Sequence, residues 1–223
     1  MSFREEILAD GIRLICGDCR EVLPTLGKFD AVVTDPPYGI RADENPVRGS
    51  DKHERLGWDR CRPEKQIFQE ILKIGSSQII WGGNYFTDFL PPTMRWLVWD
   101  KLQGDFSLSD CEFAWCSENK AARIFRYSRG AANQDNKGHP TQKPLALMKW
   151  CINFFPWAVT ILDPFMGSGT TGVAAVKLGR KFTGIEIEPK YFDIACRRIS
   201  EALKQPDFFI EKPKPVKQEA MDL

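Results

Sequence analysis

Histidine is scarce in this sequence: His53 and His139 are the only two in 223 residues. A Ser-His-Asp triad or a histidine-rich metal site is therefore not supported. Long apolar runs are also absent, and none approaches the length of a membrane span. The N-terminal residues lack the apolar core of a signal peptide. We therefore expect a cytoplasmic protein with no membrane partner.

The cysteines follow no regular spacing, and their number, seven, is odd. This pattern favours reduced thiols over a disulfide framework. Cys16 and Cys19 have the spacing of half a zinc site, and Cys111 with Cys116 could supply a second half. Cys16, however, lies in a strand-like run, and buried cysteines usually behave as small apolar side chains. The sequence predicts no metal site.

The chain also lacks a strong charge of either sign, since its formal net charge is +1. One segment differs. Between residues 119 and 143, six lysines and arginines accompany a single aspartate, which gives a local net charge of +5, with Phe125 and Tyr127 interleaved. A basic segment with aromatic residues fits a surface that faces phosphates. A solvated basic face is the alternative interpretation.

A rigid loop follows the apolar run at residues 29–33, which predicts a buried parallel strand. Asp35 is followed by two prolines, which end the strand and fix the backbone. In open α/β sheets, ligands bind at this end of a strand. The Asp35 carboxylate and a backbone carbonyl can accept both hydrogens of an amino group on a planar base, and Tyr38 can stack on its ring. A proline-rich turn without function is the alternative.

A second loop, at residues 163–171, follows a predicted strand at 159–162 and precedes an Ala/Val-rich helix. Gly167 and Gly169 let the backbone approach a ligand, and Glu186 ends the next strand, where it can accept hydrogen bonds from ribose hydroxyls. The third glycine of a dinucleotide-binding turn is missing. A ligand with a ribose and an amino-acid tail but no pyrophosphate therefore fits better, and Asp163 can meet its ammonium. S-adenosylmethionine has these features.

The remaining pattern indicates an α/β protein. Further strands are predicted at residues 12–16, 78–81 and 95–99, and residues 112–116 and 122–127 are expected to pair as an antiparallel hairpin. Helices are predicted from about residues 67, 145, 170 and 189. Residues 204–223 alternate lysine with proline and predict a flexible tail.

Together these motifs resemble the amino-group DNA methyltransferases of the β arrangement, over residues 1 to about 203. In that family the catalytic loop precedes the cofactor loop. Residues 35–38 resemble the catalytic motif and residues 163–169 the cofactor motif. Residues 139–144 resemble the motif that closes over the methionine end of the cofactor, and Gly17 with Asp18 resembles the acidic strand end near its adenine.

The resemblance implies an α/β fold of the S-adenosylmethionine-dependent methyltransferase (Rossmann-like) type, with a seven-stranded mixed sheet and a circularly permuted motif order. The strand at 12–16 would then neighbour the strand at 182–185. We expect one domain over residues 1–203, with target-recognition loops inserted at about 41–63 and 101–138. The short length suggests a phage or prophage member of a restriction-modification type.

The resemblance also implies an activity: site-specific transfer of a methyl group from S-adenosyl-L-methionine to N6 of adenine in double-stranded DNA, after the base is flipped out of the duplex. The predicted catalytic residues are Asp35, Pro36, Pro37 and Tyr38. The predicted cofactor-binding residues are Asp18, Asp35, His139, Thr141, Gln142, Lys143, Asp163, Pro164, Phe165, Met166, Gly167, Ser168, Gly169, Thr170 and Glu186. The predicted DNA-binding residues are Arg41, Arg48, Lys52, Arg55, Lys120, Arg123, Arg126, Arg129 and Lys137. A homodimer is possible.

Three alternatives stay open. Methylation of cytosine N4 is one, because the preference for adenine rests on aspartate at position 35, where cytosine-specific relatives more often have serine. A catalytically silent DNA-binding partner that keeps the fold is another. A methyltransferase that acts on RNA or on a protein amide uses a similar loop, and the basic segment does not separate DNA from RNA.

Overall fold

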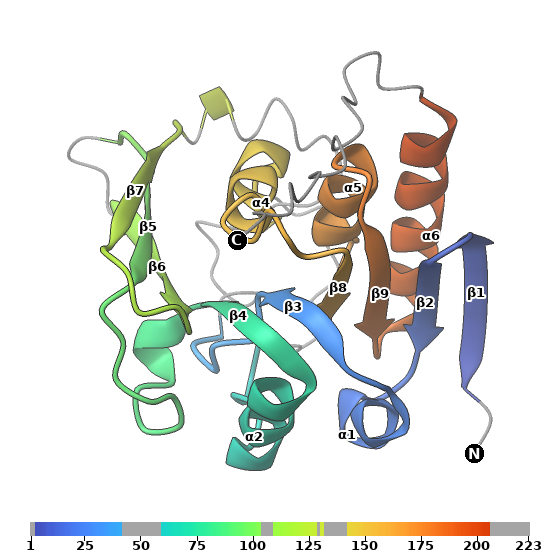
Figure 1. Ribbon diagram of the computed structural model, residues 1–223, viewed down its shortest axis with the longest axis horizontal. Helices are drawn as coiled ribbons and strands as arrows, with labels where there is room; N and C mark the ends of the chain where they lie inside the picture. Colours follow the sequence, from blue (N-terminus) through green and yellow to red (C-terminus); the bar gives the residue numbers. More distant parts are fainter. Residues whose placement is uncertain (1–2, 42–58, 104–108, 129, 132–141, 206–223) are drawn as a thin grey trace, which may run out of the picture.

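The computed structural model describes residues 3–41, 59–103, 109–128, 130–131 and 142–205. All nine strands lie in one mixed sheet, in the order β1-β2-β9-β8-β3-β4-β6-β5-β7 (Figure 1). The strands are β1 (Arg4–Ala9), β2 (Ile12–Cys16), β3 (Phe29–Thr34), β4 (Gly75–Trp81), β5 (Trp96–Asp100), β6 (Cys111–Cys116), β7 (Arg123–Arg126), β8 (Thr160–Asp163) and β9 (Lys181–Glu186).

Helices cover both faces of this sheet (Figure 1). One face carries α4 (Leu145–Ile152), α5 (Thr170–Lys177) and α6 (Pro189–Lys204), and the other carries α1 (Cys19–Val22) and α2 (Lys65–Ile74). Two short 3-10 helices, η1 (Leu23–Thr25) and η2 (Gly83–Tyr85), follow α1 and β4. Layers of this kind let each apolar face of the sheet bury itself against helices.

Each face of the sheet has its own hydrophobic core, because successive side chains of a strand point to opposite sides. In β4, Ile79 and Trp81 belong to the core under α4, α5 and α6. Ile80, which lies between them, belongs to the core under α1 and α2. The central strands are therefore apolar on both faces, as the continuous runs in the sequence predict.

The permuted strand order predicted from the sequence is confirmed. β2 pairs in parallel with β9, and Ile12 lies opposite Phe182. β8 joins β9 to β3, with Ala31 opposite Ile161. As a result, the carboxyl ends of β2, β9, β8 and β3 meet at one edge of the sheet, and the two predicted loops come together there although about 130 residues separate them.

The sheet has nine strands instead of the predicted seven. β1 was not predicted, because it is an edge strand whose charged, mostly exposed residues show no clean alternation. The expected antiparallel pair of 112–116 with 122–127 is also wrong. β6 is already flanked by β4 and β5, so β7 pairs with the free edge of β5, in parallel.

The assignment of target recognition to loops at about 41–63 and 101–138 stays a prediction. Residues 111–116 and 123–126, within the expected loop at 101–138, form strands of the main sheet. Most of the loop at 41–63, and the tail from residue 206, lie outside the described residues. In the described parts of the chain, no helix is long and apolar enough to cross a membrane, and no three acidic, cysteine or histidine side chains form a group that could hold a metal ion.

Candidate active site

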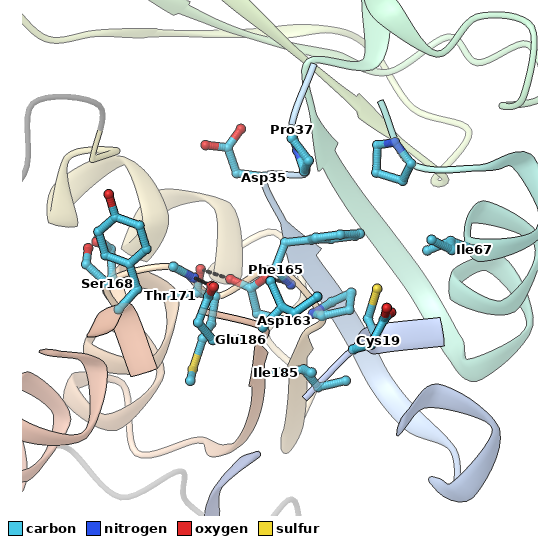
Figure 2. Close-up of a pocket in the computed structure, with 18 of the residues that line it drawn as sticks. Cys19, Asp35, Pro37, Ile67, Asp163, Phe165, Ser168, Thr171, Ile185 and Glu186 are labelled. Atoms are coloured by element: carbon cyan, nitrogen blue, oxygen red, sulfur yellow. Dashed lines mark hydrogen bonds between the residues drawn. The ribbon is translucent and has the colours of Figure 1, made fainter. Parts of the chain in front are cut away.

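A cavity of about 550 Å³ lies at the carboxyl ends of β2, β3, β8 and β9 (Figure 2). Both predicted loops contribute to its wall. The predicted site residues that line it are Asp18, Asp35, Pro37, Gln142, Lys143, Asp163, Pro164, Phe165, Met166, Gly167, Ser168, Thr170 and Glu186. Pro36, Tyr38 and Gly169 are not among the lining residues, and His139 and Thr141 lie outside the described residues.

Asp163 holds the cofactor loop to its neighbours. Its side chain is buried, and it accepts hydrogen bonds from the hydroxyl groups of Thr34 (2.7 Å) and Thr171 (2.6 Å) and from the backbone N–H of Phe165 (3.1 Å). Burial raises the pKa of Asp163 to about 6, although these hydrogen bonds favour its ionised form. The carboxylate therefore joins the ends of β3, β8 and α5, and its contact with a ligand ammonium stays a prediction.

Gly169 lies where the loop meets α6, and it is left-handed, with φ of 81°. A Cβ atom there would lie 2.9 Å from the Cβ of Ala195. Glycine is therefore required both for the turn and for close packing against the helix. This contact explains why Gly169 shapes the loop without lining the cavity. The sequence predicted that Gly169 binds the cofactor. In the structure, Gly169 packs against α6 and is not one of the lining residues.

Two acidic side chains mark one region of the cavity. Glu186 accepts hydrogen bonds from the backbone N–H groups of Gly167 (2.9 Å) and Glu188 (2.8 Å). Burial raises its pKa to about 7, against the effect of these two bonds. Asp18 caps α1, and its ion pair with Arg20 (2.6 Å) lowers its pKa. Each carboxylate has lone pairs left to accept hydrogen bonds from a ligand.

Apolar side chains also line the cavity, among them Ile67, Phe165 and Ile185 (Figure 2). A planar ring can lie between such side chains while the carboxylates accept hydrogen bonds from its amino and hydroxyl substituents. On the other side, Ser168 donates a hydrogen bond to Gln142 (3.1 Å) and accepts one from Arg198 of α6 (2.8 Å). The donor set thus fits a nucleoside that carries a polar tail, which agrees with the predicted cofactor.

Asp35, at the end of β3, is held by two donors. The hydroxyl of Tyr38 donates to one carboxylate oxygen at 2.5 Å, and the ammonium of Lys143 donates to the other at 2.6 Å. The Asp35 side chain is 29% exposed, so it also faces the open cavity. Lys143 was predicted to bind the cofactor. The structure places it at the cavity wall but attaches it to the predicted catalytic carboxylate.

The ring of Tyr38 is packed against the segment that follows β4. It stacks on Tyr85, with centroids 4.9 Å apart, and meets Phe86 edge-on. Gly82 approaches so closely that a Cβ atom there would lie 2.1 Å from the Tyr38 ring. Tyr38 was predicted to stack on a target base. In this structure its ring contacts are with the protein, and its hydroxyl orients Asp35.

Asp59 anchors the predicted catalytic loop, and no pattern in the sequence points to it. Its side chain is buried and accepts hydrogen bonds from the backbone N–H groups of Tyr38 (2.6 Å) and Gly39 (2.9 Å). Its carbonyl accepts a third from the N–H of Arg41 (3.0 Å). Such a role depends on two segments meeting in space, and nothing in the polar stretch around Asp59 distinguishes this residue.

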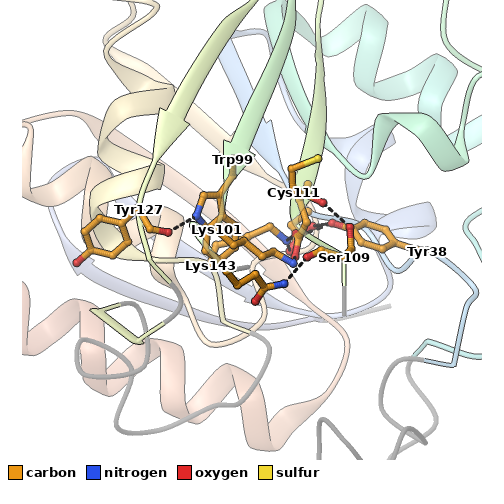
Figure 3. A network of polar contacts seen from close by, with 10 residues as sticks. Tyr38, Trp99, Lys101, Ser109, Cys111, Tyr127 and Lys143 are labelled. Carbon is orange, nitrogen blue, oxygen red and sulfur yellow. Dashed lines mark hydrogen bonds and ion pairs between the residues drawn. The ribbon is translucent and has the colours of Figure 1, made fainter. Parts of the chain in front are cut away.

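A buried ionic network continues from Asp35 into the sheet (Figure 3). Lys143 also pairs with Glu112 of β6 (3.1 Å), which pairs with Lys101 (2.8 Å). Burial disfavours the ionised form of Glu112, but the two ammonium groups outweigh it and lower its pKa to about 2. Burial alone would lower the pKa of Lys143. The carboxylates of Asp35 and Glu112 outweigh this effect, so its pKa is raised overall. Sequence reasoning missed Glu112, since it looks like any polar residue of a strand.

The predicted DNA-binding residues are only partly described. Arg41 is exposed beside the catalytic loop, and Lys120, Arg123 and Arg126 are exposed on or just before the edge strand β7. Arg126 pairs with Asp100 (3.5 Å) and Lys120 with Glu118 (3.4 Å). Arg48, Lys52, Arg55, Arg129 and Lys137 lie outside the described residues.

Comparison with known proteins gives consistent matches. A profile of a DNA methylase family, whose members modify N6 or N4 positions, matches residues 80–197. The type II methyltransferase M.HinfI of Haemophilus influenzae is 27% identical over 87% of this chain and 70% of its own length. The putative methylase YubD of Escherichia coli K12 is 28% identical over 84% of this chain and 90% of its own. The crystal structure of an M1.HpyAVI–SAM complex superposes with a TM-score of 0.54. Its sequence is 25% identical, and the match covers 83% of this chain and 98% of the M1.HpyAVI chain.

Proposed function

The chain belongs to the family of DNA methylases that modify N6 or N4 amino groups, and from this membership we propose that it methylates N6 of adenine in double-stranded DNA at a specific sequence. S-adenosyl-L-methionine is the proposed methyl donor. The observation that carries the proposal is the position of Asp35. Its partly exposed carboxylate lies at the wall of the same cavity as Glu186 and the glycine loop.

The residues of the cavity suit this donor. Glu186 would accept hydrogen bonds from the ribose hydroxyls, and Asp18 from the adenine amino group. Ile67, Phe165 and Ile185 would cover the adenine ring. When bound, S-adenosylmethionine supplies a methyl group on a positively charged sulfur and leaves as S-adenosylhomocysteine. M1.HpyAVI, whose solved structure is named as a SAM complex, supports this assignment.

Asp35 and the carbonyl of Pro36 would accept the two hydrogens of the target amino group. The lone pair of an amino nitrogen on adenine is delocalised into the ring, so the nitrogen is a poor nucleophile. Two fixed acceptors favour tetrahedral geometry and concentrate the lone pair on the nitrogen, and acceptors fixed in advance stabilise the developing charge. The nitrogen then gains the methyl group and releases one proton, which the Asp35 carboxylate would accept.

The target base would have to leave the duplex, because N6 is otherwise paired and enclosed by the stack. The exposed cations at Arg41 and along β7 would contact phosphates and position the duplex. Tyr38 and Tyr85, which stack on each other beside Asp35, would help to hold the flipped base. A homodimer on DNA is compatible with these roles.

The experiment is methyl transfer from radiolabelled S-adenosylmethionine to unmethylated duplex DNA, followed by nucleoside analysis. We expect N6-methyladenine from the wild-type chain and none from Asp35→Ala. N4-methylcytosine alone would overturn the adenine assignment. Saturable cofactor binding without transfer to any DNA would support a silent partner, and preferential transfer to structured RNA would overturn the DNA assignment. Long-read sequencing of DNA from expressing cells would give the target sequence.

A further inference from the structure

Glu112 has an unusual position for an acidic residue. It lies on β6, in the interior of the sheet. Its carboxylate forms ion pairs with two lysines that lie far apart in sequence, Lys101 and Lys143. The side chains of Lys101 and Lys143 are each 8% exposed, and that of Glu112 is 24% exposed. With Asp35, these residues form a group of two cations and two anions at the catalytic loop.

The two contacts that Glu112 makes are not equivalent. One oxygen forms a close ion pair with Lys101 at 2.8 Å. The other, Oε2, is buried and forms an ion pair with Nζ of Lys143 at 3.1 Å, a longer and weaker contact that is not a well-formed hydrogen bond. A buried acceptor without a well-formed hydrogen bond is costly. Lys143 meanwhile donates to Asp35 and to the hydroxyl of Tyr38.

The carboxylate of Asp35 therefore has competing donors. In the proposed reaction it accepts hydrogens from the target amino group, while Lys143 already occupies one of its oxygens. A rotation of Asp35 towards a base would weaken the bond to Lys143 and leave a buried ammonium with less compensation. Breaking a buried ion pair in this way is strongly unfavourable unless a second partner is available.

We propose that Glu112 is a positioning residue for the transfer reaction: it holds Lys143 beside Asp35 and takes over its hydrogen bond when Asp35 turns to the target amino group. This inference rests on the proposed function. Oε2 of Glu112 is the acceptor for that exchange: its ion pair with Lys143 at 3.1 Å needs only a small movement to become a close hydrogen bond. Lys101 fixes the other oxygen, so the carboxylate stays in place during the exchange.

The test uses Glu112→Gln, which keeps the size of the side chain but removes its charge. We expect the single-turnover rate of methyl transfer to fall by about 10- to 100-fold, as for other misplacements of a catalytic group. The dissociation constant for S-adenosylmethionine should change by less than about twofold, because Glu112 does not line the cavity. A wild-type rate in this variant would overturn the proposal.

A second variant separates positioning from charge balance. Lys101→Met combined with Glu112→Gln removes one cation and one anion, and so restores the balance that the single substitution disturbs. We expect its melting temperature to return towards that of the wild type while the transfer rate stays low. Recovery of the rate would show that Glu112 serves only to neutralise Lys101, and would overturn the proposal.

A third measurement does not depend on turnover. The ¹H–¹⁵N signal of the Lys143 ammonium, identified by its loss in Lys143→Arg, should shift in Glu112→Gln, and an unchanged signal would show that Glu112 does not hold Lys143. If the wild-type chain methylates no nucleic acid, the proposed function fails, and this signal still decides the contact. If the wild type is active and the variants match it, only the positioning role fails.

Discussion

The ammonium of Lys143 lies 2.6 Å from a carboxylate oxygen of Asp35, although 108 residues separate the two in sequence. This bond joins the segment just before α4 to the catalytic loop. The Lys143 side chain is buried, and that of Asp35 is partly exposed. The segment expected to close over the cofactor thus also holds the carboxylate that is expected to act on the substrate. Lys143 therefore contacts both the expected cofactor site and the expected catalytic carboxylate.

Replacement of Lys143 by methionine should destabilise the fold and reduce activity. The change leaves Asp35 and Glu112 without their shared cation, and loss of one partner of a buried pair typically costs about 3–5 kcal/mol. Denaturant unfolding measures this loss. Lys73→Met is the control, because Lys73 also pairs with a carboxylate, that of Glu70 at 2.8 Å, but is 67% exposed, and it should change stability by less than about 1 kcal/mol. Equal losses would contradict the assignment.

Replacement of Tyr38 by phenylalanine should lower the transfer rate without weakening cofactor binding. The ring would keep its stack on Tyr85, but Asp35 would lose a hydrogen bond of 2.5 Å. We expect a decrease of about 10- to 100-fold, in line with a net loss of roughly 1.5–3 kcal/mol for a hydrogen bond to a charged group. Single-turnover kinetics with titrated cofactor separates the two effects, and a wild-type rate would show that the hydroxyl does not orient Asp35.

Replacement of Gly82 by alanine should be much more harmful than replacement of Gly179. Both glycines are left-handed, with φ of 68° and 65°, so each substitution costs about 1–2 kcal/mol of backbone strain. Around Gly179 a Cβ atom would meet nothing within 4 Å, whereas at Gly82 it would overlap the Tyr38 ring. Gly179→Ala should therefore keep full activity in a transfer assay, and Gly82→Ala should lose most of it by displacing Tyr38.

Cofactor affinity should rise with pH between about 6 and 8. Burial raises the pKa of Glu186 from its ordinary 4.5 to about 7, and the ionised carboxylate accepts hydrogen bonds from two hydroxyl groups more strongly than the neutral acid does. Calorimetric titration with S-adenosylmethionine should show this dependence in the wild type and a weak, pH-independent affinity in Glu186→Gln. A wild-type affinity that does not vary over this range would contradict the role of Glu186.

Glu186 should also affect stability, with the opposite sign. A carboxyl whose pKa is raised on folding binds its proton more tightly in the folded state. Relative to Glu186→Gln, the wild-type chain should therefore lose stability as the pH rises from about 4.5 through about 7. Denaturant unfolding of both proteins across this range measures the difference.

The central strands and both loops could be predicted because their signals are local. Residues 29–34 and 160–163 are apolar runs that stop at an aspartate, and the structure forms β3 and β8 there. The edges of the sheet gave weaker signals. β1 and β7 are exposed and charged, and the partner of β7 was decided by the free edge of β5, which no local pattern encodes.

The sequence alone determined which residues form the two loops, because prolines, glycines and strand-ending aspartates restrict the backbone over a few residues. It also determined the order in which the motifs occur. Only the tertiary structure decided what those side chains touch. The contacts of Asp35 with Lys143, of Tyr38 with Gly82 and of Asp59 with the catalytic loop each join segments separated by at least 18 residues. Long-range packing brings these atoms within bonding distance, and packing of that kind leaves no periodic mark in a chain.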